Sequence, residues 1–336
     1  MCDHSFAVSE NGQLVAVMPL QYSPHTKRMT SSGWGGSGPV IRGDLEGVVR
    51  ERVLRLTLDY ARAQAETAAA SVLDIAISPA SRAALSQHWG VNPFIFYGYR
   101  DVSLLSQVVD LSPTPEQLFA ALPKKTRYVL RKLSSSGVQI RRVEWRHYLD
   151  TYYKVHRETY IRTGVSPHPK SYFAGIACEM APRGHAVLLA AFSADGEAIA
   201  FNNTARFGEG AFYHTGCSRS QALNLDANHL LLWHAMLAAK EDGIRWFDLG
   251  TINPLADDPK LKSLSIFKTR FGGEPHRFFR CELTLSSPTT PSVVSSPANA
   301  NTTMPAPAAP AAKPLFSRSL RGASGADLDR QTASVD

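Results

Sequence analysis

Cysteine is scarce in this chain, and its four cysteines, Cys2, Cys178, Cys217 and Cys281, lie far apart in the sequence. None belongs to a CxxC pair, and none stands beside histidines at the spacing used by metal sites. The sequence therefore predicts no metal site. Scattered cysteines of this kind are typical of reduced thiols, so we expect a cytoplasmic protein.

Long hydrophobic runs are also absent. No uninterrupted apolar stretch approaches the roughly 18 residues that a membrane-spanning helix requires. The opening segment, MCDHSFAVSENG, has neither a basic nor an apolar leader region. We therefore expect no transmembrane segment, and any membrane contact would be peripheral.

Acidic residues are outnumbered, because 36 Lys and Arg against 29 Asp and Glu give a formal net charge of +7. Such an excess favours an anionic partner, such as RNA, a nucleotide-linked molecule or an anionic lipid, although a solvated basic surface explains it equally well. The hydrophobic content of 44% is that of a folded protein, and 336 residues are enough for two domains.

The segment from Ala186 to Gly250 has the clearest pattern. Three β-rich runs are joined by short turns, and a long apolar helix from about Asp226 leads to the strand RWFDLG. This order predicts an antiparallel meander whose last connection crosses over to a parallel strand. A predicted strand and two helices precede the meander, so residues 138–285 are expected to form one complete unit.

Part of the first half repeats this pattern. Ser9 to Ala16 aligns without gaps with Ser193 to Ala200. Each hairpin leads through a strand and a helix to a strand that carries an aspartate, Asp74 in one copy and Asp248 in the other. The common order predicts a duplicated unit.

The first copy, residues 1–110, is shorter than the second. It lacks the initial strand and two helices, so either it is trimmed or the true start lies upstream of Met1. We expect its segments FIFYGYR and VSLLSQVVD to pair as closing strands. At the other end of the chain, residues 286–336 are rich in Pro, Ala, Ser and Thr and are expected to form a disordered tail.

Residues 111–137, between the two copies, hold the most basic segment, LPKKTRYVLRKLSSSG. A helix here would place Lys124, Arg127 and Arg131 on one face, because they are spaced at i, i+3 and i+7. A solvated charged face is one interpretation. Binding of an anion such as a phosphate is the other, since no acidic residue lies nearby to neutralise them.

Together these motifs resemble a known family. The order of strands and helices in the second half looks like the GNAT acyltransferase fold. Two such units with RYVLRK at the junction, an FDLG strand and FKTRFGG near the end resemble the FemABX-like branch, which includes peptidoglycan aminoacyltransferases and acetyltransferase-like proteins of polysaccharide export. The resemblance implies an α/β (α+β) fold of tandem GNAT-like domains, with mixed central sheets flanked by helices.

The resemblance also implies roles for basic residues. Lys268 of FKTRFGG stands where family members hold a phosphate or stabilise the oxyanion of acyl transfer. Arg270 of the same motif is a candidate for binding the donor or acceptor. So are the three basic residues of the junction helix, Lys124, Arg127 and Arg131.

Three further catalytic candidates lie on strands. Asp248 stands at the carboxyl end of a central strand, where it could orient an attacking amine or cap the next turn. His214 and Tyr213 could act as general base or acid, although a histidine in a strand is more often structural.

The helix-entry sequence GCSRSQALNLDANHLL departs from the family pattern. Enzymes that use CoA usually carry a Q/RxxGxG/A loop there, whose backbone N–H groups hold a pyrophosphate, and this chain lacks those glycines. The donor is therefore left open between acyl-CoA and aminoacyl-tRNA as a co-substrate, with no tightly bound cofactor. Asn224, Asp226 and Asn228 could line the acyl pocket, while Asp226 also fits a plain N-cap.

These observations predict an N-acyltransferase that moves an acyl or aminoacyl group onto an amine of a cell-envelope precursor, in peptidoglycan or exopolysaccharide. The acceptor is expected to be anionic or nucleotide-linked, and tRNA is a candidate partner. Direct attack in a ternary complex is expected, because no Cys or Ser has an evident activating partner. The alternative is a non-catalytic protein that keeps the fold and binds RNA or an anionic glycan.

Overall fold

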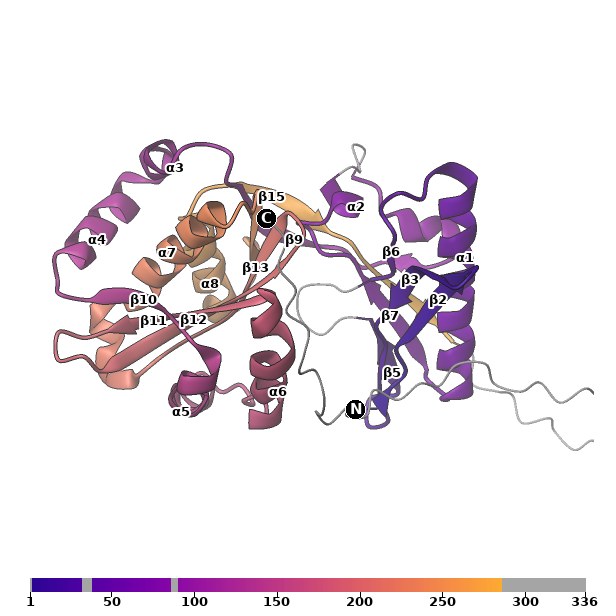
Figure 1. Cartoon of the computed structure of the whole chain (residues 1–336), viewed down its shortest axis with the longest axis horizontal. Helices are drawn as coiled ribbons and strands as arrows, with labels where there is room; N and C mark the ends of the chain where they lie inside the picture. The colour runs from indigo at the N-terminus through magenta and orange to yellow at the C-terminus, as the bar shows by residue number, and fades with distance from the viewer. Residues whose placement is uncertain (1, 32–37, 86–89, 286–336) are drawn as a thin grey trace, which may run out of the picture. The chain divides into compact units, whose positions relative to one another are not determined.

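The computed structural model describes residues 2–31, 38–85 and 90–285, and the predicted tail over 286–336 lies outside this part. The described chain builds three β-sheets flanked by helices (Figure 1). This confirms the expected mixed α/β class. The described residues form one compact unit, so the domain boundaries at 110 and 138 stay predictions.

The largest sheet belongs mainly to the second half of the chain, and its strand order is β10-β11-β12-β13-β14-β9-β15. The strands from β10 to β13 form an antiparallel meander, and β13 pairs with β14 in parallel, as predicted. The bounds are β9 Leu104–Asp110, β10 Gln139–Val143, β11 Ala186–Phe192, β12 Ala198–Phe207, β13 Gly210–Ser218, β14 Trp246–Ile252 and β15 Glu274–Phe278.

Helices cover both faces of this sheet (Figure 1). One face packs on α4 and α7 through a cluster that includes Leu130, Leu231 and Phe247. The other packs on α5 and α6 around Tyr152 and Phe173. The bounds are α3 Pro115–Ala121, α4 Lys124–Ser134, α5 Trp145–Arg162, α6 Lys170–Gly175, α7 Ala227–Glu241 and α8 Pro259–Thr269, and a π-helical turn over Ile176–Met180 continues α6.

The first half builds two smaller sheets, with strand orders β1-β4-β5-β7-β16-β8 and β2-β3-β6. Helix α1 contributes Leu58 to a core that also holds Met18, Leu73 and Ile75. The bounds are β1 Cys2–Asp3, β2 Phe6–Glu10, β3 Gln13–Met18, β4 Gln21–Ser23, β5 Arg28–Thr30, β6 Val40–Ile41, α1 Gly47–Thr67, β7 Val72–Ala76, α2 Arg82–Leu85, β8 Arg100–Asp101 and β16 Arg280–Thr284.

The two larger sheets repeat one topology. The order β4-β5-β7-β16-β8 matches β12-β13-β14-β9-β15, and in each set a parallel pair is followed by an antiparallel strand. Asp74 in β7 and Asp248 in β14 occupy matching places. The aligned hairpin turns also match, since Gly12 and Gly196 have φ angles of +78° and +80°. These equivalences agree with the predicted duplication.

Each half lends one strand to the sheet of the other. β9, from the first half, lies between β14 and β15, whereas β16, from the end of the second half, lies between β7 and β8. The prediction that FIFYGYR and VSLLSQVVD pair as closing strands is therefore wrong. Residues Pro93–Tyr97 form a 3-10 helix, because the Asn92 side chain accepts a bond from Phe94 N and caps its start.

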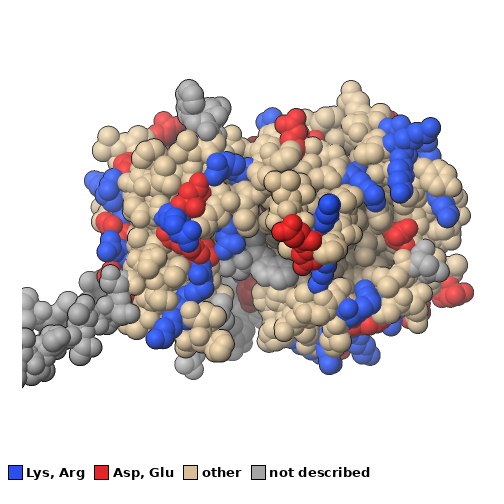
Figure 2. All heavy atoms as spheres, turned by 180° about the vertical axis from the view of Figure 1, so that it is seen from behind, with Lys and Arg blue, Asp and Glu red and all other residues tan. Residues whose placement is uncertain are grey.

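Charges of both signs are intermixed over much of the surface in Figure 2. Basic side chains gather at the upper edge of the half that carries α3 and α4. Within the described residues, no helix combines the length and the apolarity needed to cross a bilayer.

Candidate active site

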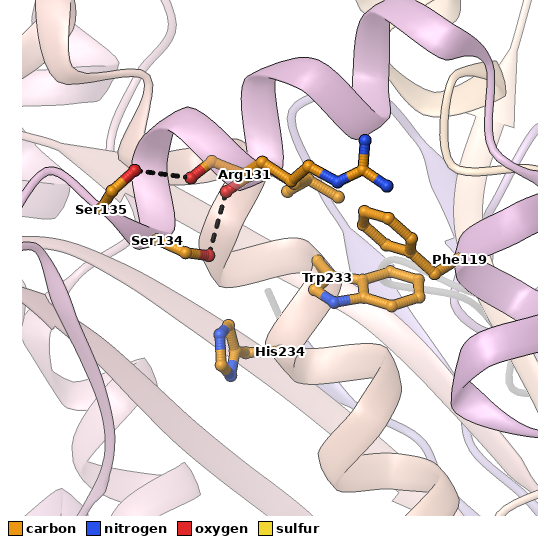
Figure 3. A pocket seen from close by; sticks show the side chains of 7 residues that line it. Phe119, Arg131, Ser134, Ser135, Trp233 and His234 are labelled. Carbon is orange, nitrogen blue, oxygen red and sulfur yellow. Dashed lines mark hydrogen bonds between the residues drawn. The ribbon is translucent and has the colours of Figure 1, made fainter.

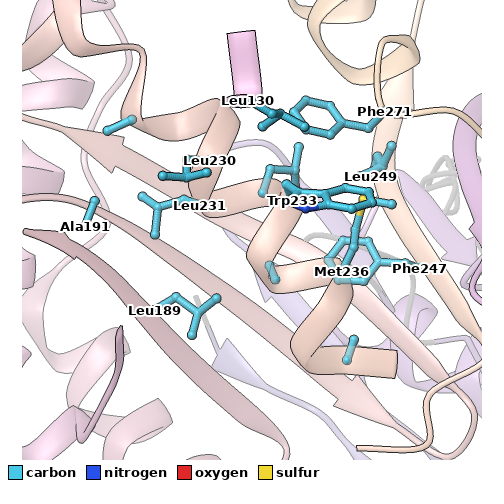
Figure 4. Packing of buried hydrophobic residues seen from close by; sticks show 14 of the residues in the cluster. Leu130, Leu189, Ala191, Leu230, Leu231, Trp233, Met236, Phe247, Leu249 and Phe271 are labelled. Atoms are coloured by element: carbon cyan, nitrogen blue, oxygen red, sulfur yellow. The ribbon is translucent and has the colours of Figure 1, made fainter. Parts of the chain in front are cut away.

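The two central strands of the large sheet separate at their carboxyl ends. β13 and β14 pair over only three positions, which end with Phe212 opposite Asp248, although both strands continue further. Where a parallel pair diverges, groups from both strands face a shared gap. Phe247 and Leu249 point toward Met236 of α7 (Figure 4), so strand alternation puts Asp248 on the opposite face.

Both strands are irregular at this gap. His214 is the additional residue of a bulge in β13, because Tyr213 and Thr215 pair with consecutive residues of β12. The register of β14 shifts just after Asp248, where Gly250 has a φ angle of +89°. Bulges turn side chains away from the regular alternation and are common beside functional sites.

Asp248 is the buried carboxylate of the gap, with 1% of its surface exposed. Its Oδ1 accepts hydrogen bonds from Ser106 Oγ at 2.5 Å and from Gly250 N at 2.8 Å. Burial raises the pKa of Asp248 to about 6, against the opposing effects of these bonds and of the Lys268 charge. No described residue donates a hydrogen bond to Oδ2, so this oxygen can take a proton.

Lys268 reaches the same gap from α8, and it is 8% exposed. Its Nζ donates to the Thr251 carbonyl at 2.8 Å. Burial lowers the pKa of Lys268 to about 8, while the nearby Asp248 charge acts in the opposite direction. A side-chain carbon at position 250 would lie 2.9 Å from Lys268 Nζ. Any residue other than glycine there would therefore crowd the ammonium group. Arg270 of the same motif is half-buried at the end of α8.

Tyr213 and His214 are neighbours in sequence but have different surroundings. Tyr213 packs into the apolar cluster beside α7, and burial raises its pKa. His214 instead bonds through Nε2 with the Tyr172 hydroxyl at 2.9 Å and through Nδ1 with Asn203 Nδ2 at 3.0 Å. Burial lowers the pKa of His214 to about 4, so its imidazole is neutral at physiological pH. Strand alternation thus puts the two predicted acid–base candidates on opposite faces of the sheet.

The start of α7 lies at the far end of β13. Asn228 Nδ2 donates to Ser218 Oγ at 3.4 Å and ties the helix to the strand. Asp226 occupies the N-cap position of α7, as one interpretation expected, but its backbone is left-handed with φ of +48° and its side chain makes no cap hydrogen bond. The side chain of Asn224 lies outside the described residues.

The predicted anion-binding residues of α4 have separate roles in the structure. Arg127 is half-buried, and its Nη1 donates to the carbonyls of Ala120 and Leu122, each at 2.6 Å. These bonds satisfy the last carbonyls of α3 and fasten it to α4. Lys124 is exposed at the first position of α4.

Arg131 borders a small pocket between α4 and α7. Its guanidinium carbon lies 5.2 Å from the centre of the Phe119 ring. The pocket has a volume of about 360 Å³, and Trp233 and His234 of α7 line its other wall (Figure 3). A cation beside aromatic rings can hold a planar or anionic group, but this pocket belongs to the helical face opposite Asp248.

The structure adds partners that the sequence did not indicate. Ser106, which bonds to Asp248, comes from the exchanged strand β9. Tyr172 and Asn203, which hold His214, come from α6 and β12. No local pattern could have found them, because their relation to the site depends on pairing between distant segments.

The matching position of the first half is occupied differently. Asp74 Oδ2 pairs with Arg28 at 3.2 Å and with Arg280 at 2.7 Å, and Glu282 joins the same group through Arg28. Two guanidinium groups thus neutralise the buried carboxylate. The first half therefore does not repeat the arrangement around Asp248.

The described residues hold no group of three or more His, Cys, Asp or Glu side chains arranged to bind a metal ion. Residues 122–259 match the family described as "Acetyltransferase (GNAT) domain". No curated protein matches the sequence significantly.

Several solved structures share the tandem fold. FemX aligns with a TM-score of 0.62 at 15% identity, covering 84% of this chain and 88% of its own. The C-terminal domain of a putative lysylphosphatidylglycerol synthetase from Agrobacterium fabrum aligns with a TM-score of 0.59 at 16% identity, covering 83% and 84%. A tandem GNAT protein from the clavulanic acid biosynthesis pathway aligns with a TM-score of 0.50 at 14% identity. The alignment covers 83% of this chain and 82% of that protein.

Proposed function

From a chain that carries a GNAT domain within a FemX-like tandem fold, we infer an N-acyltransferase that moves an acyl or aminoacyl group onto an amine of a cell-envelope precursor, in peptidoglycan or exopolysaccharide. One observation carries this proposal. A buried carboxylate, Asp248, and a buried ammonium group, Lys268, meet at the gap where β13 and β14 diverge.

Asp248 is suited to the role of general base. In the proposed reaction the amine nitrogen attacks the acyl carbonyl, and Oδ2 of Asp248 takes the proton that the amine loses. A pKa of about 6 leaves the carboxylate ionised at neutral pH yet basic enough to accept a proton. Ser106 and Gly250 hold the other oxygen and fix the orientation of the group.

Lys268 is suited to stabilising the oxyanion that forms on the acyl carbonyl. Its ammonium group has three donors, and the Thr251 carbonyl uses one of them. In a buried site a fixed positive charge lowers the barrier more than it would in water. The bond between the acyl carbon and the donor then breaks. The donor leaves as a thiolate or an alkoxide and takes up the proton that Asp248 accepted from the amine.

His214 is better suited to positioning than to proton transfer. Its low pKa makes it a weak base, and both ring nitrogens already have hydrogen-bond partners. Its hydrogen bond orients the Tyr172 hydroxyl, a group that can donate to or accept from a polar ligand.

The donor is proposed to be acyl-CoA, the usual co-substrate of the GNAT fold, or an aminoacyl-tRNA. The likeness to a putative lysylphosphatidylglycerol synthetase supports an aminoacyl group. Asp226 points the same way, because an acidic residue at the start of α7 disfavours a pyrophosphate there.

The test is transfer by the purified full-length protein with acyl-CoA or charged tRNA as donor and a panel of cell-envelope amines as acceptors. Lys268→Ala is expected to lower kcat by about 10²–10³-fold, the usual effect of losing one oxyanion donor. The dissociation constants of donor and acceptor should change little. Lys262→Ala is the matched control, because Lys262 is exposed on the same helix.

A second outcome separates the two functions predicted from the sequence. If Lys268→Ala changes only ligand binding and no donor supports transfer, the protein is a binding module and the enzyme proposal fails. Thermal shifts with each donor identify ligands independently, because a ligand at 100 times its dissociation constant stabilises the fold by about 2.7 kcal/mol.

A further inference from the structure

A large groove runs between residues of the two halves, on the face of the sheet that carries Asp248. Its volume is about 860 Å³, within the range of small-molecule sites. The first half contributes apolar side chains that include Val40 and Ile77, and the second half contributes Met180, Phe212 and Trp246. Val40 is 44% exposed, so this apolar surface is open to a ligand.

The groove adjoins the proposed reaction centre at Phe212. Phe212 is the cross-strand partner of Asp248, and a ring carbon of Phe212 would lie 3.5 Å from a side-chain carbon placed at Gly250. The same position lies 2.9 Å from Lys268 Nζ. Phe212 therefore borders both the groove and the gap.

Among the described residues that line the groove, one cation is not engaged by another described side chain. Arg50 of α1 is half-buried, and its side chain forms no hydrogen bond or ion pair with another described residue. The other charged side chains of the lining are engaged, since Arg206 pairs with Asp242 and Glu209 has a partner of its own. A partly desolvated guanidinium favours a carboxylate or phosphate.

We propose that this groove binds the acceptor, and that the acceptor is an amphipathic amine. Its amine lies at Asp248, its apolar chain follows the groove, and its acidic group pairs with Arg50. This inference rests on the proposed function for the role of the amine. The apolar lining is the reason for the ligand's apolar chain, and Arg50 is the reason for its acidic group.

Calorimetry with ω-aminoalkanoates of increasing length tests the inference. The titrations use full-length protein without an acyl donor, so that no turnover occurs. Affinity is expected to rise roughly three- to fourfold for each methylene group that the groove buries. Affinity independent of chain length would overturn the proposal.

Substitutions test the two ends of the ligand. Arg50→Gln is expected to weaken binding of the longest ω-aminoalkanoate about tenfold or more, and to leave an alkylamine of equal length unaffected. Arg55→Gln on the same helix, where Arg55 is exposed and paired with Glu51, is the control. Ala205→Trp, opposite Phe212, should abolish binding by filling the groove. Equal losses in Arg50→Gln and Arg55→Gln would contradict the role of Arg50.

These results can fail separately from the proposed function. Transfer to short polar amines without any dependence on chain length would refute the groove ligand and keep the enzyme. Binding with the expected dependence, but no transfer from any donor, would refute the enzyme and keep the groove. Melting temperatures of all variants distinguish a lost site from a lost fold.

Discussion

At the scale of single residues, burial shifts the pKa values of Asp248 and Lys268 toward each other. Burial raises the pKa of the carboxyl to about 6 and lowers that of the ammonium to about 8, because each charged form loses hydration. Asp248 is mostly ionised only above about pH 6, and Lys268 is mostly protonated only below about pH 8. Both groups are therefore charged only between these two pH values. The proposed chemistry needs both charges at once.

The activity should therefore have a bell-shaped pH profile. The rate is expected to rise as pH increases through about 6, when Asp248 ionises, and to fall as pH increases through about 8, when Lys268 loses its proton. The measurement is kcat/KM against pH in a constant-ionic-strength buffer. A profile that stays flat across both limits would contradict these two assignments.

Ser106→Ala should move the acid limb of that profile. The Ser106 hydroxyl stabilises the ionised form of Asp248, so its removal raises the pKa of the carboxyl further. The shift is expected to be about one unit, because a charged hydrogen bond contributes ~1.5–3 kcal/mol and one unit corresponds to 1.36 kcal/mol. Ser112→Ala, which removes a comparable bond to Asp110 on the surface, is the control. An unmoved limb would show that another group is the base.

At the scale of elements, irregularities decide the site more than the regular strands do. Without its bulge, β13 would keep Tyr213 and Thr215 on one face. The bulge instead leaves Tyr213 in the α7 cluster, while Thr215 bonds to the Tyr152 hydroxyl of α5 at 2.7 Å. His214, the additional residue of the bulge, bonds to the Tyr172 hydroxyl of α6.

The helix pair α3 and α4 gives a prediction about Arg127. Arg127→Gln is expected to destabilise the protein by about 1–3 kcal/mol in urea unfolding, because two carbonyls at the end of α3 lose their charged donor. The KM of the donor should not change. Lys124→Gln, at an exposed position of α4, should leave stability unchanged. If Arg127→Gln raises KM at constant stability, the arginine binds an anion as the sequence suggested.

At the scale of the whole molecule, the exchange of β9 and β16 joins the two halves into one folding unit. Each large sheet contains an interior strand from the other half. Removal of either half would leave the remaining sheet with two unpaired edges in its middle. The halves are therefore expected to unfold together.

Core substitutions in the two halves test this cooperativity. Leu73→Ala in β7 and Leu249→Ala in β14, both at fully buried positions, are each expected to cost about 2–5 kcal/mol. Both should lower the midpoint of the same single transition, measured by calorimetry and by circular dichroism. Two separate transitions, each moved by only one of the variants, would disprove the coupling.

The sequence alone determined the local elements and the residue types of the site. Alternation and turn residues predicted the hairpins, the apolar run predicted α7, and the crossover predicted the parallel pair of β13 and β14. The motifs singled out Asp248 and Lys268, which the structure brings to one gap. These features depend on neighbours in the chain, so a local pattern carries them.

Only the tertiary structure decided how distant segments meet. It placed β9 in the far sheet and so gave Asp248 its partner Ser106, and the bulge at His214 put Tyr213 and Thr215 on opposite faces of the sheet. It also engaged Arg127 with backbone carbonyls and neutralised Asp74 with two arginines. Strand order, bulges and burial arise from contacts between residues far apart in sequence, and periodicity does not encode which segments pair.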